Sequence, residues 1–119
     1  MDISRAALFG KLNPTLFKAI EGATVFCKLR GNPYVELVHW LHQIVNLADS
    51  DIHRIARHFG LNMSVLQNDM TAYMATLPNG ASSISDFSHH VTESIERAWV
   101  FSTLYFNAPM IRGAYLLAV

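Results

Sequence analysis

The sequence predicts an all-α fold in which one helical unit occurs twice. Residues 13–31 have the marks of a capped helix: Asn13 is a favourable N-cap, Pro14 fits the first helical position, and Gly31 can end the helix with positive φ. The apolar pattern inside these caps returns 75 residues later along the chain. The paired core positions are Leu16 and Val91, Ile20 and Ile95, Ala23 and Ala98, and Cys27 and Ser102. The same shift pairs Asn32 with Asn107, Trp40 with Tyr115, and Leu41 with Leu116.

Length and composition indicate one folded domain. The chain has 119 residues, of which 51% are hydrophobic and 15% charged, so a sizeable core can form and disorder is disfavoured. Nine basic residues balance nine acidic ones, which gives no electrostatic case for binding nucleic acid or an anionic membrane. A single cysteine excludes an internal disulfide and fits a reducing compartment. Without a signal peptide or an apolar run near the roughly 20 residues that span a bilayer, we expect a cytoplasmic protein.

The other elements of the first unit follow from caps and helix breakers. Residues 2–9 form a predicted helix too short to be stable alone, so it must pack against another element. The Asn32-Pro33 turn leads into a helix over residues 35–47 that is apolar on nearly every side and therefore buried. Two further helices follow, over 49–59 and 62–77. The inward positions expected on the last helix are Val65, Leu66, Met70, Tyr73 and Leu77.

Small and polar residues dominate 79–88, which is the linker-like segment of the chain. A helix over 88–106, a turn at 107–109 and a helix from 111 then repeat the beginning of the first unit. The second unit is therefore incomplete. The expected organisation within 1–119 is an extra amino-terminal helix (1–10), a first repeat (11–78), a linker (79–87) and a partial second repeat (88–119).

Two patterns suggest chemistry, and each lacks a necessary part. Glu36-x-x-His39 is half of a di-iron carboxylate motif, but the repeat places Ile111 and Ala114 at the equivalent positions, so the site cannot close. The six histidines form no convergent set, and no phosphate-binding loop or catalytic signature is present. We expect no catalytic residue, metal ligand or cofactor here. A small helical metal-binding or enzymatic domain is the alternative.

The second pattern resembles a helix-turn-helix. Ala56, Gly60 and Leu66 have the spacing of its small residue, turn glycine and buried aliphatic residue. The helix that would enter DNA, residues 63–77, contains no Lys or Arg. Because phosphate neutralisation supplies most of the affinity for DNA, a DNA binder is a less favoured alternative.

A second strip lies opposite the core face of the first long helix, along Lys18, Gly22, Val25 and Leu29. Gly22 is a poor helix former, which calls for a packing explanation. Two interpretations remain open at this point. The short amino-terminal helix can fill the strip completely, or the two helices can form the walls of a groove that accepts a helix from a partner.

Four stretches of sequence resemble a known family: LFGKLNPT, EGAT, CKLRGNPYVELVHWL and SDIHRIARHFGL. They are similar to the amino-terminal domain of Clp-type AAA+ unfoldases. The specific residues in these stretches most resemble the ClpV branch, which serves type VI secretion. The resemblance implies an all-α pseudo-repeat of two four-helix halves, with an extra short amino-terminal helix and an incomplete second half here. It also implies a non-enzymatic domain that recognises an amino-terminal helix of the large sheath subunit, so that the parent ATPase disassembles contracted sheath.

The resemblance further implies that ATP and Mg belong to ATPase modules outside this chain. The parent protein is then a hexamer, the isolated domain a monomer, and neither nucleic acid nor membrane is a partner. The resemblance places the peptide groove between the short helix and the first long helix. The expected groove residues are Ile3, Ala6 and Ala7 on one wall, Leu12, Thr15, Leu16, Lys18, Ala19 and Gly22 on the other wall and floor, and Phe87 as a lip.

Overall fold

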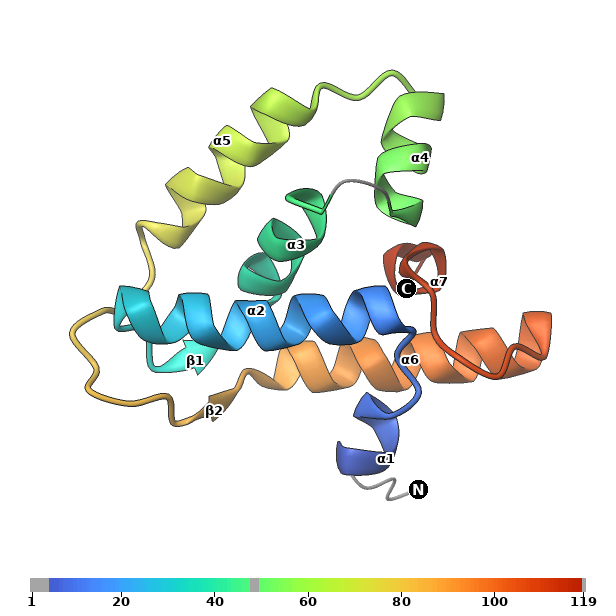
Figure 1. Ribbon diagram of the computed structural model, residues 1–119, viewed down its shortest axis with the longest axis horizontal. Coiled ribbons are helices and arrows are strands. Elements are labelled where there is room, and N and C mark those ends of the chain that lie inside the picture. The colour runs from blue at the N-terminus through green and yellow to red at the C-terminus, as the bar shows by residue number, and fades with distance from the viewer. Residues whose placement is uncertain (1–4, 48–49, 119) are drawn as a thin grey trace.

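The computed structural model describes residues 5–47 and 50–118. It confirms the all-α prediction, with two very short strands in addition (Figure 1). The elements are α1 (Arg5–Phe9), α2 (Pro14–Arg30), β1 (Tyr34–Val35), α3 (Leu37–Val45), α4 (Asp51–His58), α5 (Met63–Met74), β2 (Asp86–Phe87), α6 (His89–Phe106) and α7 (Gly113–Ala118). Over the described residues, none of these helices has the length and apolar character to cross a membrane.

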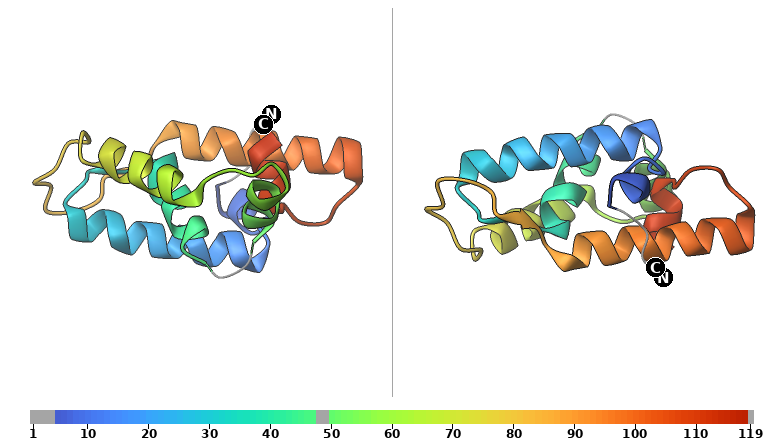
Figure 2. Two further views of the ribbon diagram at one scale, coloured as in Figure 1. Left: turned by 90° about the horizontal axis from the view of Figure 1, so that it is seen from above. Right: turned by 90° about the horizontal axis from the view of Figure 1, so that it is seen from below.

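The two long helices, α2 and α6, frame the molecule. They run in opposite directions along its long axis (Figures 1 and 2), and α3 packs on α2 on the upper side of the pair in Figure 1. The inward positions predicted for α2 are all buried, and so are Val91, Ile95, Ala98 and Ser102 of α6. The repeated apolar stripe therefore forms the core, as the periodicity predicts.

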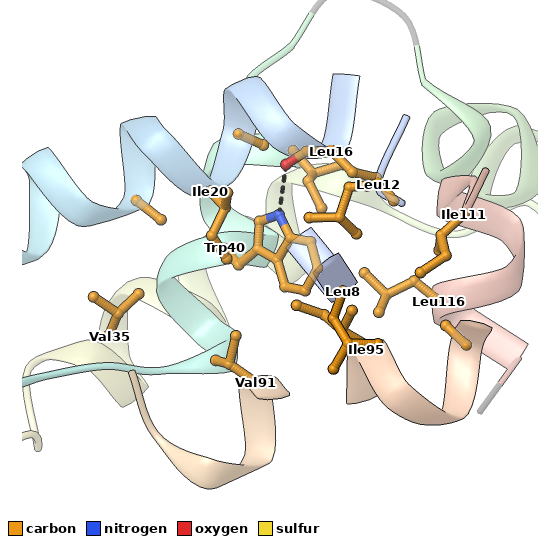
Figure 3. Packing of buried hydrophobic residues seen from close by; sticks show 14 of the residues in the cluster. Leu8, Leu12, Leu16, Ile20, Val35, Trp40, Val91, Ile95, Ile111 and Leu116 are labelled. Carbon is orange, nitrogen blue, oxygen red and sulfur yellow. Dashed lines mark hydrogen bonds between the residues drawn. The ribbon is translucent and has the colours of Figure 1, made fainter. Parts of the chain in front are cut away.

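Trp40 of α3 occupies the centre of this core. Its side chain is fully buried, and its indole Nε1–H donates to the backbone oxygen of Leu16, 3.1 Å away (Figure 3). A buried indole needs such an acceptor, because an unpaired N–H in an apolar environment is costly. Leu8, Leu12 and Ile111 belong to the same buried cluster.

Backbone hydrogen bonds join the segment before each long helix to the loop after the other. Asn13 N donates to Ile111 O at 2.8 Å, and Ile111 N donates to Lys11 O at 2.6 Å. In the equivalent place, Ser88 N donates to Val35 O at 2.8 Å, beside the parallel β1–β2 pair. Strands of two residues carry no local signal, so the sequence did not predict them.

The spacing between the repeats changes by one residue at the end of α6. Gly31 caps α2 and Asn107 caps α6, both with positive φ, and these positions are 76 apart. The first residues of α3 and α7, Leu37 and Gly113, keep this spacing of 76. The fixed spacing of 75 is therefore wrong beyond the long helices. It matched Asn32 with Asn107, Trp40 with Tyr115, and Leu41 with Leu116. With a spacing of 76, the repeat position equivalent to Trp40 is Leu116, and both side chains belong to the core cluster.

α5 buries a narrower face than its sequence suggested. Met70 and Met74 are buried against Val38 and Val45 of α3, and Met63 and Leu77 pack at the edges of this second cluster. The inward assignment of Val65, Leu66 and Tyr73 is wrong, because these side chains are 52%, 37% and 56% exposed. The apolar residues of α5 outnumber the positions that its packing on α3 can cover.

Gly31 and Gly60 both have positive φ, but only Gly31 has neighbouring atoms that an added side chain would contact. Gly31 has φ 71°, and a Cβ there would lie 3.1 Å from the backbone nitrogen of Gly80. Gly60 has φ 67°, with nothing within 4 Å of such a Cβ. Left-handed geometry costs an L-residue roughly 1–2 kcal/mol. We expect Gly60→Ala to lower the free energy of unfolding by about 1 kcal/mol and Gly31→Ala by clearly more, as measured by urea denaturation. Equal losses would contradict the steric contribution at Gly31.

Candidate functional site

α1 packs chiefly against α6, and not along α2 as the sequence suggested. Figure 1 shows it below the two long helices, on the side away from α3. Leu8 anchors it in the core with 3% of its surface exposed. The Phe9 ring meets the Phe87 ring nearly edge-on, with centroids 5.1 Å apart. The surface around α1 is therefore built from α1, β2 and α6 together.

The predicted groove residues fall into two groups. Ala6, Ala7 and Lys18 are exposed, while Thr15 and Phe87 are half-buried. These five can contact a ligand without any change in the core. Ile3 lies outside the described residues. Phe87 is the member that the structure connects directly to α1, through its contact with Phe9.

The second group faces inward. Leu12, Leu16 and Ala19 are each at most 2% exposed and belong to the main core cluster, so they support the surface from beneath. Gly22 faces α3, where a Cβ would lie 2.7 Å from Oε1 of Gln43. The missing side chain at Gly22 therefore accommodates α3, and neither α1 nor a partner helix is needed to explain it.

Thr15 and Leu16 also line a polar cavity of about 190 Å³ between α2, α4 and α7. At its edge, Asp51 accepts hydrogen bonds from Nε and a terminal nitrogen of Arg112, at 3.0 and 2.8 Å, and one from Ala114 N at 3.3 Å. The bond from Arg112 is the main reason that the pKa of Asp51 lies below its ordinary value. This carboxylate is engaged in joining α4 to α7.

The Glu36-x-x-His39 pair forms a helix cap. The Glu36 side chain accepts the backbone N–H of His39, and His39 Nδ1 accepts the N–H of Glu36 at 2.8 Å. His39 Nε2 lies 3.1 Å from Oδ1 of Asn32, whose amide donates to Pro78 O at 2.7 Å. Both ring nitrogens are therefore engaged, which accounts for a histidine at a fully buried position.

Cys27 is equally committed to the fold. Its Sγ lies 3.3 Å from Asn32 O and 3.2 Å from Tyr34 O, with the thiol placed to donate. Burial, followed by the nearby Glu36 charge, raises the pKa of this thiol, so it stays protonated and unreactive.

A second apolar surface lies on the carboxyl-terminal half of α6, and the sequence analysis missed it. A hollow of about 570 Å³ is lined by Glu96, Arg97, Val100, Phe101, Leu104 and Tyr105. Its repeat counterpart could have been recognised: Phe26, the equivalent of Phe101, packs on the cluster around Met70 and Met74. The structure thus offers two candidate surfaces for protein binding, one around α1 and one on α6.

The fold and its apolar surfaces define an all-helical repeat domain suited to protein binding. No protein-family model matches the chain. The AAA+ ATPase ClpV1 of Pseudomonas aeruginosa strain PAO1 is 56% identical over 98% of the chain, which spans 13% of that relative. A solved structure described as "Coevolution of the ATPase ClpV, the TssB-TssC Sheath and the Accessory HsiE Protein Distinguishes Two Type VI Secretion Classes" is also 56% identical, with a TM-score of 0.93 over 98% of this chain and 72% of that one. The chain belongs to the family of ClpV amino-terminal domains.

A more distant structure shares the fold. It is described as "Complex of ClpV N-domain with VipB peptide", is 23% identical, and has a TM-score of 0.87. The alignment covers 98% of this chain and 71% of that one. At 23% identity, this match shows that the two chains share a fold.

Burial of His39 predicts a loss of stability in mild acid. Burial, and then the positive charges of Arg30 and His42, lower the pKa of His39 from 6.5 to about 4 in the folded state. The unfolded chain therefore takes up a proton first, so this contribution is complete above pH 6.5 and is lost as the pH falls toward 4. We expect the free energy of unfolding to fall by about 3 kcal/mol through His39 over this range, as measured by urea denaturation at several pH values.

The variant His39→Gln isolates this effect. Lowered pKa values at His42 and Asp51 act in the same direction, and they remain in the variant. The stability gap between wild type and His39→Gln should therefore narrow as the pH falls from 6.5 to 4. A gap that stays constant over this range would show that the histidine is protonated equally in both states.

Proposed function

We propose that this chain is the substrate-recognition domain of a type VI secretion unfoldase and that it binds an amino-terminal helix of the large sheath subunit. Membership of the ClpV family supports this role. A ClpV N-domain with the same fold is described in complex with a VipB peptide. The observation that carries the proposal is the position of α1, which is anchored by Leu8 and exposes Ala6 and Ala7 to solvent.

The surface around α1 favours an amphipathic helix as the ligand. Ala6 and Ala7 are small, so a partner backbone can come close, and Phe9 on the same helix contacts Phe87. Burial of apolar area contributes about 25 cal/mol per Å², reduced by the cost of ordering a free peptide. Because this attraction does not depend on charge, the affinity should change little with salt.

In this proposal the domain binds and positions its substrate, and catalysis belongs to the rest of the parent protein. ATP and Mg would act in ATPase modules outside this chain, within a hexameric parent in the cytoplasm. The domain itself would need no cofactor, would be monomeric when isolated, and would bind neither nucleic acid nor membrane. The balance of nine basic and nine acidic residues is consistent with an apolar protein ligand.

Ala6→Asp tests the surface around α1. The substitution places a carboxylate on the exposed face of α1, where a bound apolar ligand would leave it desolvated and unpaired. Titration with an amino-terminal peptide of the cognate large sheath subunit should show at least a tenfold loss of affinity, or about 1.4 kcal/mol. The circular dichroism spectrum should stay unchanged, because Ala6 is exposed.

Leu104→Asp provides the matched control on the α6 surface. Leu104 is 75% exposed, so the same charge is introduced without disturbing the core. Affinity should stay at the wild-type level. If Leu104→Asp abolishes binding and Ala6→Asp does not, the ligand occupies α6 and the assignment to α1 is wrong. Deleting residues 1–9 is a poorer test, because it also removes the buried Leu8.

A further inference from the structure

Three side chains with metal-binding groups converge on the first turns of α6, two of them histidines for which the sequence predicted no convergent set. One ligand atom from each of His89, His90 and Glu93 lies within 4.8 Å of the others. Helical spacing brings Glu93 close to each histidine, since it is four residues from His89 and three from His90. The two imidazole rings lie side by side, with centroids 4.0 Å apart. We propose that these residues form a binding site for a transition-metal dication of the Zn²⁺ or Ni²⁺ type.

The donor set selects the class of metal. Imidazole nitrogen suits Zn²⁺ and Ni²⁺, whereas Mg²⁺ and Ca²⁺ require mainly oxygen ligands. Two imidazoles and one carboxylate supply three of the four ligands of a tetrahedral Zn²⁺, and water can supply the fourth. His89 and His90 are exposed and Glu93 is half-buried, so a hydrated ion can reach all three.

Two features oppose binding and limit its strength. Glu93 already forms an ion pair with Arg97, at 2.7 Å, which the metal must displace. The pair is largely exposed, so displacing it costs little. The positive end of the α6 dipole also disfavours a cation near the first turn. Affinity must therefore come from the directional bonds of all three ligands, and loss of any one should be severe.

The position of the site indicates what the metal would do. His89 directly follows Ser88, whose backbone N–H donates to Val35 O beside the β1–β2 pair. A metal bound by His89, His90 and Glu93 would stabilise the first turns of α6, which begin at this junction. Because an ion that binds only the folded state stabilises it, binding should raise the melting temperature. This inference does not rest on the proposed function, because none of the three ligands is among the residues expected to contact the sheath peptide.

Calorimetric titration of the untagged chain with Zn²⁺ tests the site. We expect one binding event, with affinity at least tenfold weaker in His89→Ala, His90→Ala and Glu93→Gln. Arg97→Ala should bind Zn²⁺ at least as tightly as wild type, because it releases Glu93 from the ion pair. His58→Ala is the matched control, since this histidine is exposed on α4, and it should bind as wild type does. The melting temperature should rise with Zn²⁺ in wild type and not in the double variant His89→Ala, His90→Ala.

Nuclear magnetic resonance with Ni²⁺ locates the ion independently. Paramagnetic broadening should be strongest at residues 89, 90 and 93 and absent around His58. The proposal is overturned if wild type binds no Zn²⁺, if the double variant binds it as tightly as wild type, or if broadening centres elsewhere. Circular dichroism of each variant confirms that the helical content is retained, because none of the three side chains is buried.

Discussion

The fold depends on a reciprocal exchange of backbone hydrogen bonds between its two halves. The segment before α2 pairs with the loop after α6, and the segment before α6 pairs with the loop after α2. These loops lie against the core, where unpaired backbone groups are costly. Each half therefore satisfies polar groups of the other, which fixes α2 and α6 in opposite directions and places Trp40 between them (Figure 3).

The two halves have equivalent cores and unequal surfaces. In the first half, α5 covers α3 and packs around Phe26 through Met70 and Met74. On α6 the equivalent of Phe26 is Phe101, which lines the hollow together with Leu104 and Tyr105, and these last two are 75% and 74% exposed. Only Phe101 has a counterpart that α5 helps to cover, because Val25 and Leu29, the counterparts of Val100 and Leu104, are 61% and 81% exposed on α2 as well. Such exposure occurs in both halves, and by itself it is weaker evidence for a ligand than a surface built from added elements.

Sequence periodicity predicted the helices and the core, because both depend on local spacing. Leu16, Ile20 and their repeat partners are all buried as expected. The single-residue change at the end of α6 was missed, since a fixed spacing cannot show where a helix gains a residue. The groove residues were predicted less well, because Leu12, Leu16 and Ala19 belong to the core. α1 packs against α6, and the inward face of α2 is covered by α3 with its Trp40. Which element covers a helix face is a tertiary property.

The attachment of α1 ties the surface proposed for peptide binding to the junction between the halves. A five-residue helix has no stability of its own, so its position is set by Leu8 in the core and by Phe9 against Phe87. Phe87 belongs to β2, which pairs with β1 from the first half. A ligand bound to the outer face of α1, as proposed, would therefore depend on residues whose positions are set by the backbone hydrogen bonds between the two halves. The exposed face of α1 can change without loss of core packing, whereas a change at Leu8 or Phe87 would disturb both the fold and the surface.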